Sequence, residues 1–113
     1  MAHDEALASR FRDGLEGQTG TSEKKMMGAM CFFLQGNMIG GADRNKDGQG
    51  RFMFRVGKDN AAEALTRKGA RIAEIGGRRM GGFIFVHEED CDEGELKDWI
   101  ALALSFVSTL PSK

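Results

Sequence analysis

The fold of this chain is decided by residues 30–56, which read MCFFLQGNMIGGADRNKDGQGRFMFRV. Residues 30–34 are all apolar, which is typical of a short strand buried on both faces. Gly36 and Asn37 follow this run. Because both residues tolerate positive φ angles, they predict a two-residue hairpin turn that leads into a second strand at residues 38–42.

A third strand is predicted at residues 51–56, because apolar residues alternate there with more polar ones. Phe52, Phe54 and Val56 share one face of this strand, which we expect to be buried. The opposite face is expected to be more exposed to solvent.

The loop between the second and third strands, residues 43–50, begins like a calcium-binding loop. Asp43, Asn45 and Asp47, followed by a glycine, match the alternating oxygen ligands of that motif. The match then ends, because Phe54 takes the position of the bidentate glutamate and the flanking segments are predicted strands. A hairpin loop favours the same residue types, so we expect no bound metal ion.

Helices are predicted at both ends of the chain. Leu7, Phe11 and Leu15 recur every four residues and indicate a helix over residues 4–15, followed by a connector at residues 17–22. Near the other end, Asp92 and Glu95 form an acidic variant of the capping box, and Pro111 ends the helix that follows. The apolar stripe of this last helix consists of Leu96, Trp99, Ile100, Ala103, Leu104 and Val107.

The middle of the chain adds a short helix, which we expect Asp59 to cap and Gly69 to end. Ile72 and Ile75 indicate a fourth strand, and residues 83–86 indicate a fifth. The predicted order α-β-β-β-α-β-β-α indicates an α+β fold with two layers, in which helices cover one side of an antiparallel sheet of about five strands. A chain of 113 residues suits a single domain, residues 1–113.

The composition argues against several functional classes. The formal net charge is -1, so no global field attracts nucleic acid or anionic lipid. No stretch is apolar over the length that spans a bilayer, so we expect a cytoplasmic protein without a membrane partner. Cys31 and Cys91 are too few and too far apart in sequence for a disulfide framework or a zinc site.

A catalytic or cofactor site is not expected. His3 and His87 are the two histidines, and neither has a recognisable Ser or Cys partner. Cys91 follows several acids, whose charge raises a thiol pKa and suppresses the reactive thiolate. A metal-dependent or thiol enzyme at His87 and Cys91 is therefore the least favoured of the hypotheses considered.

Charge is segregated along the second half of the chain. The segment between Arg67 and Arg79 is basic, and the segment between Glu88 and Asp98 is acidic. The basic segment supports an alternative function, namely nucleic-acid binding that weakens steeply with salt. The two segments are also complementary, which favours either a balanced surface within one molecule or self-association.

A further set of residues spans nearly the whole chain in a recognisable order and spacing. It consists of Lys24, Lys25, Met26, Gly28, Gly36, Asn37, Met38, Arg55, Val56, Gly57, Gly69, Gly77, Arg78, Met80, Gly82, Leu96, Trp99, Ala103, Phe106, Leu110, Pro111 and Lys113. Through these residues the chain resembles the N-terminal domain of the TfoX/Sxy family of bacterial competence regulators. The resemblance implies an α+β domain without established catalytic residues.

The leading hypothesis is a non-enzymatic regulatory domain that docks a protein partner. We expect the docking surface to be a sheet edge or a methionine-rich surface, with Arg55, Arg78, Arg79 and Met80 as partner-binding residues. The domain is expected to form a homodimer.

Overall fold

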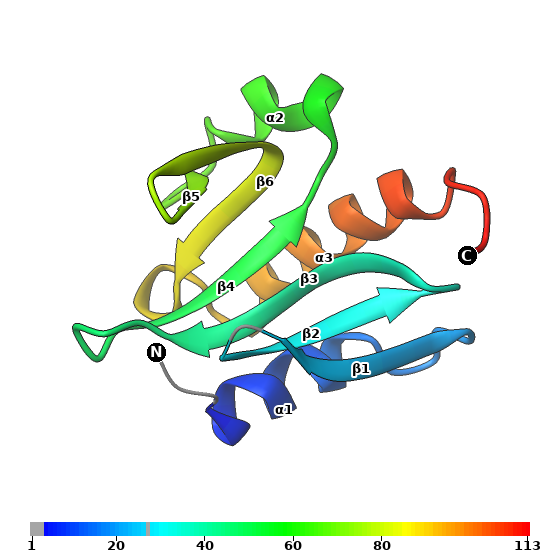
Figure 1. The fold of residues 1–113 in the computed structure, drawn as a ribbon, viewed down its shortest axis with the longest axis horizontal. Coiled ribbons are helices and arrows are strands. Elements are labelled where there is room, and N and C mark those ends of the chain that lie inside the picture. The colour runs from blue at the N-terminus through cyan, green and yellow to red at the C-terminus, as the bar shows by residue number, and fades with distance from the viewer. Residues whose placement is uncertain (1–3, 27) are drawn as a thin grey trace.

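A computed structural model describes residues 4–26 and 28–113 of the chain (Figure 1). The elements, in chain order, are α1 (Glu5–Gly14), β1 (Thr21–Met26), β2 (Ala29–Leu34), β3 (Asn37–Arg44), β4 (Gly50–Arg55), α2 (Lys58–Ala64), β5 (Arg71–Ile75), β6 (Arg78–His87), the 3-10 helix η1 (Glu88–Asp90) and α3 (Glu93–Val107).

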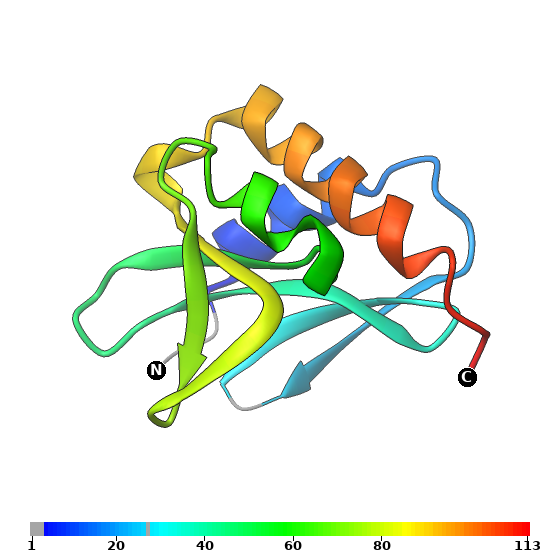
Figure 2. The same ribbon diagram turned by 90° about the horizontal axis from the view of Figure 1, so that it is seen from above.

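The six strands form one antiparallel sheet in the order β1-β2-β3-β4-β6-β5. All three α-helices lie on the same side of this sheet (Figure 2). On that side α1 and α3 pack on β3 and β4, and α2 packs on β6. The predicted α+β fold with helices on one side is therefore confirmed, with six strands instead of about five and the order α-β-β-β-β-α-β-β-α.

The strand that the sequence did not predict is β1. It pairs with β2 along its whole length, from Thr21 opposite Leu34 to Met26 opposite Ala29. Its sequence, TSEKKM, is polar, and every residue before Met26 is exposed. An edge strand without a buried face carries no apolar alternation, which is the signal that would identify it.

The turn between β2 and β3 is a two-residue hairpin, as predicted, but it lies one residue earlier. Gln35 and Gly36 are the turn residues, and both have positive φ angles, 52° and 84°. Asn37 is instead buried at the start of β3, where its side-chain Nδ2 donates a hydrogen bond to the carbonyl oxygen of Pro111 at 2.8 Å. Asn37 therefore anchors the C-terminal segment to the sheet.

The core lies between the sheet and the helices and is organised by stacked aromatic rings. Phe11 of α1 stacks on Phe32 with 4.5 Å between ring centroids and on Phe54 with 5.8 Å. Phe54 in turn stacks on Trp99 of α3 at 5.3 Å. One continuous stack thus joins both long helices to the centre of the sheet. The predicted capping box of α3 is present, with both Asp92 and Glu95 bonded as expected.

The short helix α2 begins differently from the prediction. Its N-cap is Gly57, which makes no side-chain cap bond, and Asp59 lies in the first turn. The chain passes close to β6 here, because the N–H groups of Val56 and Gly57 both donate to the carbonyl oxygen of Gly82, at 2.8 and 3.1 Å. Gly57 and Gly82 have φ angles of 87° and 83°, and a Cβ on Gly82 would lie 3.0 Å from the Gly57 backbone. Glycine is required at this crossing.

Candidate functional site

The side of the sheet that carries no helix is hollowed into a groove of about 700 Å³. In Figure 2 the β5–β6 hairpin projects away from the helices and flanks this side. The lining residues are Met26, Ala29, Cys31, Met38, Gly41, Ala42, Asp43, Arg51, Met53, Glu74, Ile75, Gly76, Arg78, Arg79, Met80, Gly81, Phe83 and Phe85. We refer to this feature as the sheet groove.

The floor of the sheet groove is a row of residues that face one another across four strands. Cys31 of β2 is opposite Gly41 of β3, Gly41 is opposite Met53 of β4, and Met53 is opposite Phe85 of β6. Gly41 adds no side chain to this row, and a Cβ there would lie 2.8 Å from the carbonyl oxygen of Met30. The other three side chains are apolar, so the floor is apolar.

Methionine side chains form a large part of the lining of the sheet groove. Met26, Met38, Met53 and Met80 all line it, and all four are half-buried. Flexible and polarizable methionine side chains adapt to differently shaped partners, and contact surfaces use them for this reason. The predicted methionine-rich docking surface therefore has a candidate location, and its binding role stays a prediction.

One ion pair within the sheet groove is held rigidly. Arg51 donates to Asp43 in a two-point contact, at 2.8 and 3.2 Å, and the guanidinium lies 4.1 Å from the ring centroid of Phe85. The Asp43 carboxylate is buried and lies directly across the sheet from Arg51. The positive charge of Arg51 offsets the negative charge of the Asp43 carboxylate. The groove therefore does not repel an acidic partner at that point.

The predicted partner-binding residues divide into two groups. Arg78, Arg79 and Met80 line the sheet groove, and both arginines are exposed, with no ion pair to any described residue. Arg55 is absent from the lining. Its guanidinium lies 5.7 Å from the ring centroids of both Phe83 and Phe106, so it is engaged within the fold.

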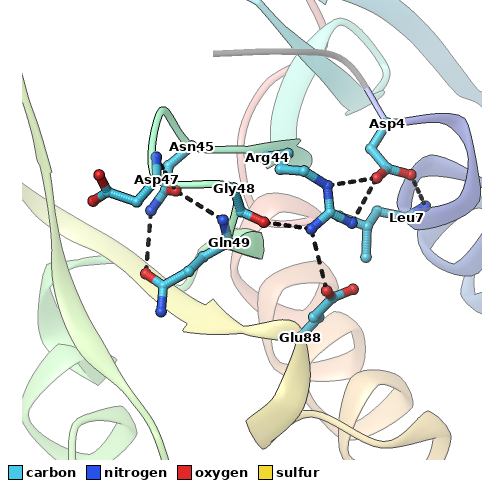
Figure 3. Close-up of polar contacts among 8 residues, drawn as sticks. All are labelled: Asp4, Leu7, Arg44, Asn45, Asp47, Gly48, Gln49 and Glu88. Atoms are coloured by element: carbon cyan, nitrogen blue, oxygen red, sulfur yellow. Dashed lines mark hydrogen bonds and ion pairs between the residues drawn. The ribbon is translucent and has the colours of Figure 1, made fainter.

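The three candidate calcium ligands make separate contacts, and Figure 3 shows two of them, Asn45 and Asp47, in the loop between β3 and β4. The Asp43 carboxylate bonds Arg51, and the side-chain oxygen of Asn45 accepts hydrogen bonds from the backbone N–H groups of Asp47 and Gln49, both at 2.9 Å. The Asp47 side chain is exposed. Asn45 thus closes the hairpin loop, and the three side chains are not arranged around a common point.

Arg44 joins three segments at the base of the same loop (Figure 3). It lies 2.7 Å from the Asp4 carboxylate, donates to the Gly48 carbonyl oxygen at 2.7 Å and lies 3.5 Å from the Glu88 carboxylate. Asp4 also caps α1 by accepting from the N–H group of Leu7. This network connects the start of α1, the hairpin loop and the segment after β6.

Exchange of Asp4 for asparagine is expected to lower the free energy of unfolding by up to about 1 kcal/mol near neutral pH. Asparagine still caps the helix but no longer pairs with Arg44. The Arg44 hydrogen bond holds the pKa of Asp4 below its ordinary value of 3.8. The stabilisation is therefore present above that value and lost as the pH falls through the folded-state pKa. Urea titrations at several pH values check this, and a difference that persists unchanged in acid would contradict it.

His87 and Cys91 do not form a reactive pair with a third group. Cys91 is buried in the core, whereas His87 is half-buried at the end of β6, opposite Arg51. No three His, Cys, Asp or Glu side chains within residues 4–26 and 28–113 are close enough to hold one metal ion. His3 lies outside the described residues.

The Cys91 thiol is expected to resist alkylation in the folded protein. Burial raises its pKa to about 12, Arg10 opposes that shift, and Glu95 adds to it. The reactive thiolate is therefore scarce at neutral pH. Iodoacetamide followed by peptide mass mapping should label Cys91 only after addition of urea. Complete labelling in native buffer at the rate of the unfolded control would contradict this expectation.

The basic and acidic segments of the second half already meet within the molecule. Lys68 pairs with Glu95 at 3.1 Å, and the Arg67 guanidinium lies 5.0 Å from the ring centroid of Trp99. Arg78 and Arg79 lie apart from these contacts, on the hairpin that flanks the sheet groove. The balanced-surface interpretation therefore accounts for part of the charge segregation.

The central part of the groove was not predicted from the sequence. Alternation along β4 placed Met53 on the more solvent-exposed face of that strand. The sequence around Met38 and Gly41 does not indicate that these two residues lie on the same face of the sheet as Met53. They do so because the β2–β3 register shifts between Phe32 and Phe33. A β-bulge of this kind turns the residues after it to the other side of the sheet.

The fold and the groove define a two-layer α+β domain with one sheet face left open. The chain belongs to the TfoX N-terminal domain family, whose sequence model matches residues 13–107. This family is linked to competence regulation. No curated protein and no solved structure shows significant similarity to the chain. Among the described residues, no helix has the length and apolar character needed to cross a bilayer.

Proposed function

We propose that this domain is a non-enzymatic regulatory module of the cytoplasm that binds a protein partner through the sheet groove. The observation that carries the proposal is the combination of an apolar floor with two exposed arginines, Arg78 and Arg79, that have no ion pair to a described residue. An uncovered apolar surface with a charged rim is characteristic of protein interaction sites.

The distribution of reactive groups supports a binding role over a catalytic one. The Cys91 thiol is buried and its pKa is raised, and His87 has no described partner that would make it a general base for a nucleophile. Catalysis of acyl or proton transfer needs such groups to converge on one point. The groove itself offers mainly apolar contacts and arginines.

A differential purification tests the proposal. Tagged wild type, the double variant R78E/R79E and the control K46E/K97E would each be recovered from the source cells and compared by quantitative mass spectrometry. Lys46 and Lys97 are exposed and lie outside the groove, so the control carries the same change of charge. We expect at least one protein that the wild type and the control retain and the groove variant loses. Identical protein sets for all three would contradict the proposal.

Nucleic-acid binding is a second candidate because Arg71, Arg78 and Arg79 are all exposed on the β5–β6 hairpin. Arg67 and Lys68 of the same segment are engaged with Trp99 and Glu95. The remaining positive charge is small for phosphate-driven binding. A mobility-shift titration with single-stranded and duplex DNA at low salt separates the candidates: a complex that R78E/R79E abolishes would favour nucleic acid.

Self-association remains a prediction of the sequence. The outer edge of β1 has no neighbouring strand within the sheet, and its residues before Met26 are exposed. Such an edge permits pairing with a second chain, although Lys24 and Lys25 disfavour it. Sedimentation equilibrium over a range of protein concentrations measures the oligomeric state directly.

A further inference from the structure

The position of the sheet groove restricts the kind of backbone that it accepts. The groove crosses the face of the sheet, and the four central strands β2, β3, β4 and β6 each have a neighbour on both sides. Their backbone N–H and C=O groups are committed to those neighbours. An extended segment lying on this face would leave its own backbone groups without ladder partners, whereas a helix satisfies its backbone internally.

The other face of the same sheet shows what covers such a surface. There, α1 and α3 lie on β3 and β4 and bury apolar stripes that include Phe11 and Trp99. A sheet whose two faces are both apolar is normally covered by helices on both sides. In this chain no helix lies over Met53 and Phe85 among the described residues. The Arg51 guanidinium lies over the Phe85 ring, which is 8% exposed, and Met53 is half-buried.

The charges at the groove specify the polar part of the partner. The Asp43 carboxylate is neutralised by Arg51. Glu74 is the remaining lining acid and is opposite Arg79 in the sheet, but no ion pair joins them. Two exposed guanidinium groups against one exposed carboxylate leave a positive rim, which complements carboxylates on an incoming chain.

From these observations we infer that the occupant of the sheet groove is an amphipathic helix of a partner protein, with acidic residues flanking its apolar stripe. This inference rests on the proposed function and names the partner class for the same site. The apolar stripe packs on the floor between Cys31 and Phe85, and its carboxylates meet Arg78 and Arg79.

The size of the sheet sets the length of such a helix. Five gaps between six strands, at about 4.8 Å each, give a face about 24 Å wide. A helix rises about 1.5 Å per residue, so about 16 residues cross the whole face. Three to four apolar residues in every two turns of that length form one stripe, at i, i+3, i+4 and i+7 spacing that then repeats.

Two synthetic peptides of about this length test the inference. Both carry the same stripe of leucine and phenylalanine, while the polar positions hold glutamate in one and lysine in the other. Each is labelled with fluorescein and titrated by anisotropy with wild type, R78E/R79E and K46E/K97E. Thermal unfolding confirms that each variant is folded, which the exposure of all four residues favours.

We expect the glutamate peptide to bind wild type about tenfold more tightly than the lysine peptide does. R78E/R79E should remove this preference or invert it, and K46E/K97E should leave it within about twofold. Equal binding of the two peptides would overturn the inference that the partner carries acidic residues. A glutamate peptide that does not bind wild type at all would overturn the inference that the partner is a helix.

Other occupants give different results. If a second copy of this chain fills the groove, wild type sediments as a dimer, R78E/R79E sediments as a monomer and the glutamate peptide does not bind, which overturns the inference. Loss of a cellular partner by R78E/R79E without peptide binding would overturn the partner class and leave the proposed function standing. Peptide binding without any such partner would count against the proposed function instead.

Discussion

Replacing Phe54 by alanine is expected to lower the free energy of unfolding by about 3 to 5 kcal/mol. Phe54 is fully buried and lies between Phe11 of α1 and Trp99 of α3 in the aromatic stack. Its removal leaves a cavity at a point where β4 contacts both helices through stacked rings. This loss is a large fraction of the stability of a typical small domain. Urea unfolding followed by tryptophan fluorescence measures it.

Phe83→Ala provides the matched control, because the same atoms are removed from the opposite face of the sheet. Phe83 lines the groove and is only half-buried. We expect a loss of about 1 kcal/mol, which includes the contact with Arg55. Equal losses for the two variants would mean that the groove face is as tightly packed as the core. That outcome would contradict the two-layer description.

Exchange of Gly40 for alanine is expected to have the second largest effect, a loss of about 2 kcal/mol or more. A Cβ at Gly40 would overlap the carbonyl oxygen of Met53 and lie 3.2 Å from the ring of Phe11. The obstructing atom belongs to the backbone of β4, so the β3–β4 pairing itself must shift to make room. The same urea titration measures the effect.

Gly94→Ala is the corresponding control within a helix. Gly94 lies in the first turn of α3, and a Cβ there would meet only the Asp92 side chain, at 3.5 Å. Alanine reduces the conformational entropy of the unfolded chain, so we expect a gain of up to about 1 kcal/mol. If Gly40→Ala caused no larger loss than Gly94→Ala, this result would contradict the close packing of β3 against β4 at Gly40.

The elements with strong periodicity were predictable from the sequence. Apolar spacing placed α1 and α3, and alternation placed β4, because each of these elements buries one face in a single core. The polar edge strand β1 carried no such pattern. The turn at Gln35 was also not predicted, because Gly36 and Asn37 are the residue types that favour a turn. In the structure Gln35 and Gly36 form the turn, and Asn37 donates a hydrogen bond to Pro111.

The candidate site was predictable only at its rim. Arg78, Arg79 and Met80 were predicted as partner-binding residues, and all three line the groove. Its floor depends on which residues face each other across several strands, which is a property of the register. The bulge at residues 32 and 33 changes that register without leaving a local signal. Arg55 is absent from the lining, and its guanidinium lies 5.7 Å from the ring centroids of Phe83, a lining residue, and of Phe106. Its role in partner binding stays a prediction.

The most direct test of the account is methyl NMR of methionine-labelled protein during addition of the glutamate peptide. Met26, Met38, Met53 and Met80 line the sheet groove, whereas Met30 packs against the core. Single exchanges to leucine assign the signals. The account predicts that the four groove methyl signals shift with a common dissociation constant while that of Met30 stays in place. Binding that leaves the four signals unchanged would show that the open face of the sheet is not the docking surface.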